Sequence, residues 1–110
     1  MSQGVGGVGV AGAITVVTRF IVPDETPEFT AGFIANGVRL RAAFEARPGH
    51  VRTTLARALE DPTRWVLVSE WTGVGAWRRA LSAYDVRIEV MPLMALAENE
   101  PAVYENPDGF

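Results

Sequence analysis

Few side chains of this sequence are suited to chemistry, and most of those few are aromatic or amide groups. Trp65 and Trp71 belong to the alternating run RWVLVSEW, so both point to the same side of a strand. Asn36 interrupts an apolar helical stripe, and a buried amide requires hydrogen-bond partners. His50 is the one histidine, the residue type that titrates near neutrality. These residues are candidates for binding or orienting a small molecule.

Each of these candidates also has a purely structural explanation. Indole rings beneath a helix usually belong to the hydrophobic core. Asn36 and Gly37 are poor helix formers, so the pair would in this interpretation interrupt or kink the helix and turn the amide to water. His50 follows Pro48-Gly49 without a carboxylate partner in the neighbouring sequence, as is typical of a solvated turn. The sequence leaves both interpretations open.

The glycines near the start of the chain match the pattern of a dinucleotide-binding turn. Gly4-Val5-Gly6-Gly7-Val8-Gly9 satisfies G-x-G-x-x-G. That turn requires a strand before it and a helix after it. Only three residues precede Gly4, and the β-branched run AITVVTRFIV follows Gly12. We therefore expect a flexible leader over residues 1–12 and no binding of NAD or FAD.

Composition argues against several classes of function. The 110 residues include no cysteine and a single histidine, which argues against a metal site. The net charge is −3, and ten basic residues are offset by thirteen acids, which argues against a nucleic-acid partner. No apolar stretch is long enough to span a bilayer. The sequence predicts a cytoplasmic protein with neither a metal nor an organic cofactor.

The first two predicted elements are a strand and a long helix. Residues 13–22 alternate in the strand period and place Thr18 on the inward side. From Pro27 to Ala46 the apolar spacing becomes helical, with Thr26 as the N-cap. The helical stripe consists of Phe29, Phe33, Asn36, Leu40 and Phe44. Phe33 and Asn36 are thus expected on the face that covers the sheet.

The remaining elements complete a recognisable order. Two strands within residues 50–73 are joined by a hairpin at Glu60-Asp61-Pro62. A short helix is expected over 74–84, and a last strand over 85–97, where Pro92 marks an edge or a bulge. The order β-α-β-β-α-β is ferredoxin-like, an α+β fold with two helices on one face of a four-stranded antiparallel sheet. Residues 13–97 would form this domain.

The other face of the predicted sheet is left bare and is too apolar to face water. It carries Val17, Ile21, Val66 and Val68. A homodimer packed sheet to sheet would cover these side chains. Arg19 and Glu70 are expected to pair their charges within that interface. The tail, residues 98–110, is either disordered or reaches across to the partner subunit.

One stretch, PGHVRTTLARALEDPTRWVLVSEWTGVGAWRRAL, resembles the central part of the antibiotic biosynthesis monooxygenase family of dimeric α+β barrels. The matching landmarks are Pro48-Gly49, Glu60-Asp61-Pro62 and the segment from Trp65 to Trp71. The haem-degrading branch resembles the chain over the same stretch, but it places an asparagine and a haem-ligating histidine where this chain has Thr18 and Ala80. Haem degradation is therefore not expected.

The oxygenase branch of the family implies chemistry without metal or flavin. A polycyclic phenol is deprotonated in a dry pocket, its carbanion passes an electron to O₂, and recombination leads to a quinone. The resemblance implies a site between helices and sheet, where the Trp71 indole orients a phenolate. The expected substrate contacts are Asn36, Trp65, Phe33, Thr18 and His50. The alternative function is a non-enzymatic module of the same fold that binds a small ligand or regulates another protein.

Overall fold

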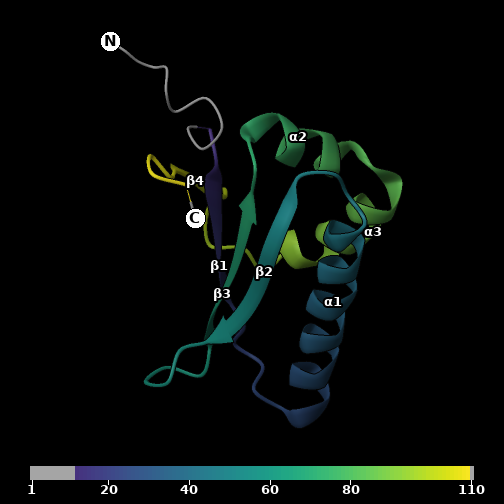
Figure 1. Cartoon of the computed structure of the whole chain (residues 1–110). Helices are drawn as coiled ribbons and strands as arrows, with labels where there is room; N and C mark the ends of the chain where they lie inside the picture. The colour runs from purple at the N-terminus through teal and green to yellow at the C-terminus, as the bar shows by residue number, and fades with distance from the viewer. Residues whose placement is uncertain (1–11, 110) are drawn as a thin grey trace.

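The computed structural model describes residues 12–109 and shows a four-stranded antiparallel sheet with three helices over one face (Figure 1). In chain order the elements are β1 (Ile14–Ile21), α1 (Pro27–Glu45), β2 (His50–Arg57), β3 (Arg64–Trp71), α2 (Val74–Ser82), α3 (Tyr84–Met94) and β4 (Ala102–Glu105). The strand order is β2-β3-β1-β4. The ferredoxin-like α+β fold is confirmed, whereas the glycine motif of residues 4–9 lies outside the described residues.

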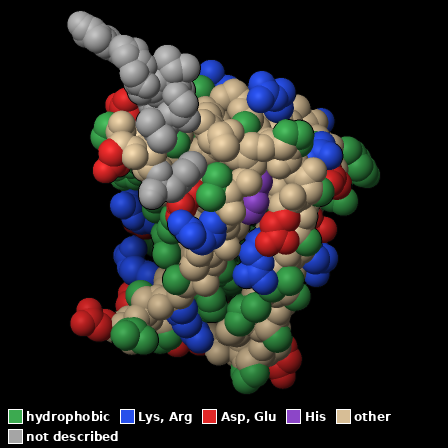
Figure 2. Space-filling view, viewed as in Figure 1, with side chains coloured by type: hydrophobic (Ala, Val, Ile, Leu, Met, Phe, Trp, Pro, Cys, Tyr) green, Lys and Arg blue, Asp and Glu red, His purple; other side chains and the backbone are tan. Residues whose placement is uncertain are grey.

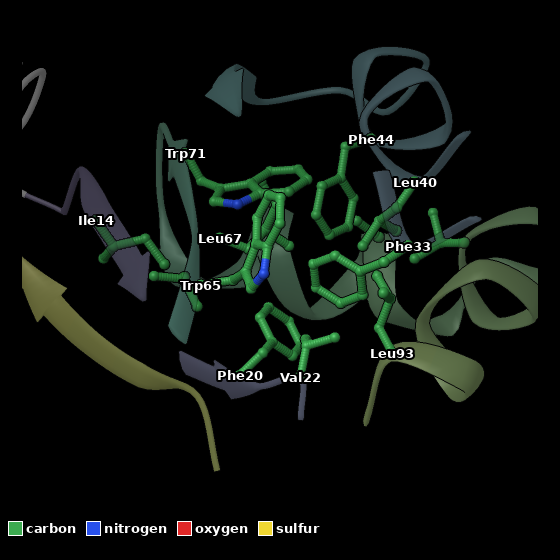
Figure 3. Packing of buried hydrophobic residues seen from close by; sticks show 14 residues of the cluster. Ile14, Phe20, Val22, Phe33, Leu40, Phe44, Trp65, Leu67, Trp71 and Leu93 are labelled. Carbon is green, nitrogen blue, oxygen red and sulfur yellow. The ribbon is translucent and has the colours of Figure 1, made fainter. Parts of the chain in front are cut away.

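The core lies between the sheet and the helices, because β1 and β3 alternate as the sequence predicts. Val16 and Phe20 on β1 are buried, and so are Trp65 and Trp71 on β3. The strands pair with Phe20 opposite Trp65. Figure 3 shows the indole rings of these two tryptophans packed against the phenyl rings of Phe33 and Phe44 on α1. The inward face of β1 and β3 therefore combines three aromatic side chains with aliphatic and hydroxyl-bearing ones.

Helix α1 begins where the sequence predicts, but it is not interrupted in the middle. The Thr26 Oγ1 atom accepts a hydrogen bond from the Phe29 backbone N–H at 3.3 Å, which caps the first turn. The helix runs unbroken past Asn36 and Gly37, so the interpretation in which this pair interrupts the helix is wrong. Gly37 instead permits close packing, since a Cβ atom there would lie 2.8 Å from Leu55 Cδ2 on β2.

The Pro-Gly landmark after α1 has a steric explanation. Gly49 has a φ of +90°, a conformation that residues with a side chain rarely adopt. A Cβ atom at this position would also collide with the Cβ of Ala76 in α2. The turn thus brings the start of β2 against α2, with the Thr72 backbone N–H donating to the Gly49 carbonyl at 2.8 Å.

The predicted last strand is wrong, because residues 84–94 form α3. Val86, Ile88 and Val90 alternate as β-branched residues, which favours a strand. The same segment also places Val86, Val90 and Leu93 at helical spacing, and these side chains pack into the core. Pro92 lies in the last turn of this helix. Tyr84, the first residue of α3, is 76% exposed.

The fourth strand comes from the segment predicted to be a tail. Residues 102–105 pair with β1 of the same chain, with Ile14 opposite Glu105. The Asn106 backbone N–H donates to the Ala13 carbonyl at 2.8 Å and extends the pairing. The expectation of a disordered or partner-crossing tail is therefore wrong for this segment. The folded domain extends beyond residue 97 to include β4.

The sheet face opposite the helices carries half-buried valines and an ion pair. Val17, Val66 and Val68 line its centre. Within the chain, Glu70 is paired with Arg52 on β2 at 2.7 Å, and Arg19 lies opposite Val66. Pairing of Arg19 with Glu70 across a dimer interface stays a prediction. The sheet-to-sheet homodimer stays a prediction. Within residues 12–109, no helix is long and apolar enough to cross a membrane.

Candidate functional site

A small cavity lies between the helix-covered face of the sheet and the helices. Its volume is about 40 Å³, which holds a few water molecules at most. It is lined by Val16, Thr18, Phe20, Leu40, Phe44, Leu67, Ser69, Trp77, Leu81, Val90, Leu93, Met94 and Pro101. None of these side chains is ionisable, and hydroxyl groups occur only at Thr18 and Ser69. The cavity is therefore an apolar space with two hydroxyl groups on one wall.

Trp71 lies behind this wall and does not line the cavity. Its side chain is fully buried, and its Nε1–H donates to Ser69 Oγ at 3.0 Å. The indole packs edge to face against the ring of Phe44, with centroids 5.0 Å apart (Figure 3). It packs in the same way against the ring of His50, with centroids 5.1 Å apart. The expected contact of the Trp71 indole with a ligand is thus replaced by a contact with Ser69, a residue that the sequence reasoning missed.

Trp65 and Phe33 belong to a second group of aromatic rings, together with Phe20. Their ring centroids are 5.0 Å apart in an edge-to-face arrangement. The Arg57 guanidinium lies over the indole, 5.0 Å from its centroid. Trp65 Nε1 is buried without a hydrogen-bond partner among the described residues. Trp65 is not part of the lining of the small cavity, so the structure supports its packing role.

A larger groove opens between the first half of α1 and the end of α3. Its volume is about 290 Å³, and its wall includes Phe33 and Asn36. Asn36 is buried, and its Nδ2 atom donates to the Glu89 carbonyl at 2.9 Å and to Glu89 Oε1 at 3.1 Å. Arg39 Nε donates to the same carboxylate oxygen at 3.0 Å. The amide therefore ties α1 to α3, a role hidden from the sequence because α3 reads as a strand.

Leu93 belongs to the walls of both spaces. It is 3% exposed and lies beside Phe33 at the end of α3 (Figure 3). It is the one residue that the small cavity and the groove share. The two spaces therefore adjoin at Leu93.

His50 lies at the start of β2 and lines neither space. Its ring contacts Trp71 and reaches the surface between charged side chains (Figure 2). Nε2 is 2.7 Å from Thr53 Oγ1. Partial burial lowers the pKa of His50 below its ordinary value of 6.5, and nearby Glu45 opposes this effect. The structure thus favours neutral His50 and does not bring it to the cavity.

The lowered pKa of His50 predicts a loss of stability in acid. The unfolded chain binds a proton at His50 more readily than the folded chain does. The contribution of neutral His50 to the free energy of unfolding is therefore complete above pH 6.5 and is lost as the pH falls through the pKa of the folded protein. We expect the Tm of His50→Gln, measured by circular dichroism from pH 8 to pH 5, to fall less steeply than that of the wild type. Parallel curves would contradict this prediction.

The positions that matter for haem are also defined. Thr18 lines the small cavity, and Ala80 on α2 is 1% exposed. Neither side chain supplies an imidazole to an iron atom. Among residues 12–109, no three histidine, aspartate or glutamate side chains are grouped so as to hold a metal ion.

Comparisons with known proteins agree with this architecture. The chain is 33% identical over 94 residues to deoxynogalonate monooxygenase of Streptomyces nogalater, covering 86% of this chain and 76% of that protein. The crystal structure of SnoaB, a cofactor-independent oxygenase from Streptomyces nogalater, superposes with a TM-score of 0.74 at 32% identity, covering 86% of this chain and 92% of that one.

A more distant structure shares only the fold. A conserved protein from Methanosarcina mazei is 19% identical, with a TM-score of 0.70 over 87% of this chain and 92% of that one. The family model described as antibiotic biosynthesis monooxygenase matches residues 13–87, most of the described domain. This chain is a member of the antibiotic biosynthesis monooxygenase family.

Proposed function

We propose that this protein is a monooxygenase that oxidises a polycyclic phenol with O₂ and uses neither metal nor flavin. The observation that carries the proposal is the apolar cavity with two hydroxyl groups on its sheet wall. Similarity to SnoaB, described as a cofactor-independent oxygenase, supports the same reaction class. An apolar space of this kind suits an aromatic substrate whose charge is held by a few polar groups.

The protein would contribute desolvation and hydrogen bonding instead of a strong base. No ionisable side chain lines the small cavity. Exclusion of water strengthens each hydrogen bond to a substrate anion and protects the reactive carbanion from side reactions. In the proposed reaction, the carbanion reduces O₂ by one electron and the two radicals combine. Loss of water then converts a ring CH₂ into C=O, so one O₂ yields the carbonyl oxygen and one water.

The substrate would have to join the small cavity to the groove. Pockets for molecules of two or three rings are usually at least about 300 Å³, far above the roughly 40 Å³ of the cavity alone. The groove of about 290 Å³ lies behind Leu93. Rotation of Leu93 would open a continuous space from the two hydroxyl groups to Asn36. The reacting ring would then lie at the sheet and the remaining rings between α1 and α3.

Oxygen uptake tests the proposal directly. Purified protein treated with a chelator is mixed with a panel of anthrone-like and hydroquinone substrates, without added metal or flavin. We expect uptake above the rate without enzyme, with one O₂ consumed per quinone formed and followed by its absorbance. The control is the same protein denatured by heat, which reports spontaneous oxidation. No uptake above that control across the panel would favour the non-enzymatic ligand-binding function.

A further inference from the structure

The two hydroxyl groups of the small cavity lie close together on neighbouring strands. Val16 pairs with Ser69, and Thr18 pairs with Leu67, so Thr18 and Ser69 are diagonal neighbours on one face. Diagonal neighbours in an antiparallel pair have Cα atoms about 7–8 Å apart. Both side chains line the same cavity. Their hydroxyl groups can therefore approach one ligand atom from two strands.

Both hydroxyl protons lack an acceptor among the described residues. Thr18 is 7% exposed and Ser69 is 4% exposed. Ser69 Oγ accepts the hydrogen bond from Trp71 Nε1 at 3.0 Å, and none of the hydrogen bonds among residues 12–109 uses its own proton. None of them involves the Thr18 hydroxyl. Buried polar groups are normally paired, so two donors that face the cavity and have no acceptor among residues 12–109 suit a ligand with an acceptor atom.

Trp71 makes Ser69 a better donor. When a hydroxyl oxygen accepts one hydrogen bond, its own O–H group is polarised and donates more strongly. The indole occupies one side of the Ser69 oxygen, which turns the proton away from Trp71 and toward the open space. Since the Trp71 ring is packed between Phe44 and His50, this orientation is held by the core.

We infer that the Ser69 and Thr18 hydroxyl groups together bind the oxygen anion of the substrate, and that Trp71 is a positioning residue that acts through Ser69. The inference rests on the proposed function, because it takes the ligand to be a phenol. It assigns the contact with the phenolate to Ser69 and Thr18, two residues of the sheet. An oxygen anion accepts two donated hydrogen bonds readily, and the apolar wall around it keeps water from competing.

Binding of 2-naphthol measures this contact separately from turnover. Its ionisation is followed by absorbance in the presence of excess protein over a range of pH. We expect wild-type protein to bind naphtholate about tenfold more tightly than naphthol, which lowers the pKa of the bound phenol by about one unit. Ser69→Ala should abolish most of this difference and keep affinity for the neutral form within about threefold. Thr18→Val, which preserves shape, should remove a smaller part.

The double variant distinguishes positioning from direct contact. If Trp71 acts through Ser69, Ser69→Ala combined with Trp71→Phe should bind naphtholate no worse than Ser69→Ala alone. Ser82→Ala is the matched control, because Ser82 Oγ donates to the Arg78 carbonyl on the exposed side of α2. It should behave as wild type. A purely structural Ser69 would change the Tm without changing the pKa of bound 2-naphthol.

Three results would overturn the inference. The first is that 2-naphthol does not bind to the wild type. The second is that Ser69→Ala leaves the pKa of bound 2-naphthol as it is in the wild type. The third is that the effects of Ser69→Ala and Trp71→Phe on naphtholate binding are independent and additive. Oxygen uptake is judged separately. Protein that binds naphtholate through Ser69 but consumes no O₂ contradicts the proposed function alone. Protein that consumes O₂ with an unchanged Ser69→Ala variant contradicts this inference alone.

Discussion

Replacing Trp71 with phenylalanine should lower kcat/KM for oxidation of a phenolic polycycle by about ten- to a hundredfold. Phenylalanine keeps an aromatic ring between Phe44 and His50 but removes the Nε1–H that donates to Ser69 Oγ at 3.0 Å. Without the indole N–H, the Ser69 proton is free to turn away from the substrate anion. The expected loss is therefore that of one hydrogen bond to a charged group, about 1.5–3 kcal/mol, which corresponds to a ten- to hundredfold lower kcat/KM. The rate is measured by oxygen uptake with the best substrate of the panel.

Trp65→Phe is the matched control for this variant. It removes a second buried indole from the same strand, but one whose Nε1 has no partner and which lies outside the wall of the small cavity. Both variants should lower the Tm because both leave space in the core. Only Trp71→Phe should lose most of the activity. Equal rates of oxygen uptake for wild type and Trp71→Phe would show that the Trp71 indole has no part in the reaction.

Val68→Asp should convert a homodimer into monomers or unfolded chains. Val68 lies at the centre of the open sheet face, between Val17 on β1 and Thr54 on β2. In a sheet-to-sheet dimer a carboxylate here would be buried near its own copy, without a cation, and burial of an unpaired charge is strongly destabilising. Light scattering at micromolar concentration should report a dimer for wild type and a halved or aggregated mass for the variant.

Val38→Asp provides the same change on a different surface. Val38 lies on α1 and is 45% exposed, on the far side of the molecule from the open sheet face. This variant should remain a dimer. A wild-type protein that is monomeric at micromolar concentration, or a Val68→Asp variant that stays dimeric and folded, would contradict the expected interface.

The strands and α1 are predictable from sequence because their signals are local and agree with one another. Alternation fixes which side of β1 Phe20 faces, and the Thr26 cap with Pro27 fixes where α1 begins. α3 is different, since Val86, Ile88 and Val90 satisfy the strand period while Val86, Val90 and Leu93 satisfy the helical one. Packing against α1 decides between the two periods, and a single sequence does not contain that contact.

The candidate site is less predictable than the fold for a related reason. Thr18 lines the small cavity, because the alternation of β1 turns it to the inward face, and its contact with a substrate stays a prediction. Ser69 lies on the same face as Trp65 and Trp71, and its signal is a lone hydroxyl within an inward row of large side chains. The partner of Asn36 is a backbone carbonyl at Glu89, a group that has no signature in any sequence. The sequence therefore points to the wall of the site but not to its hydrogen bonds.

The pairing of β1 with residues 102–105 has a consequence for synthesis of the protein. While the ribosome is translating, β1 can pair with β3 once Trp71 has left the exit tunnel, but its other edge waits for Glu105. An open strand edge is a template for pairing with another chain. Nascent chains on one polysome can therefore pair with one another through β1 during the time between synthesis of Trp71 and synthesis of Glu105. Any pause in translation between these two residues lengthens that time. The yield of native protein from a cell should depend on how quickly that interval closes.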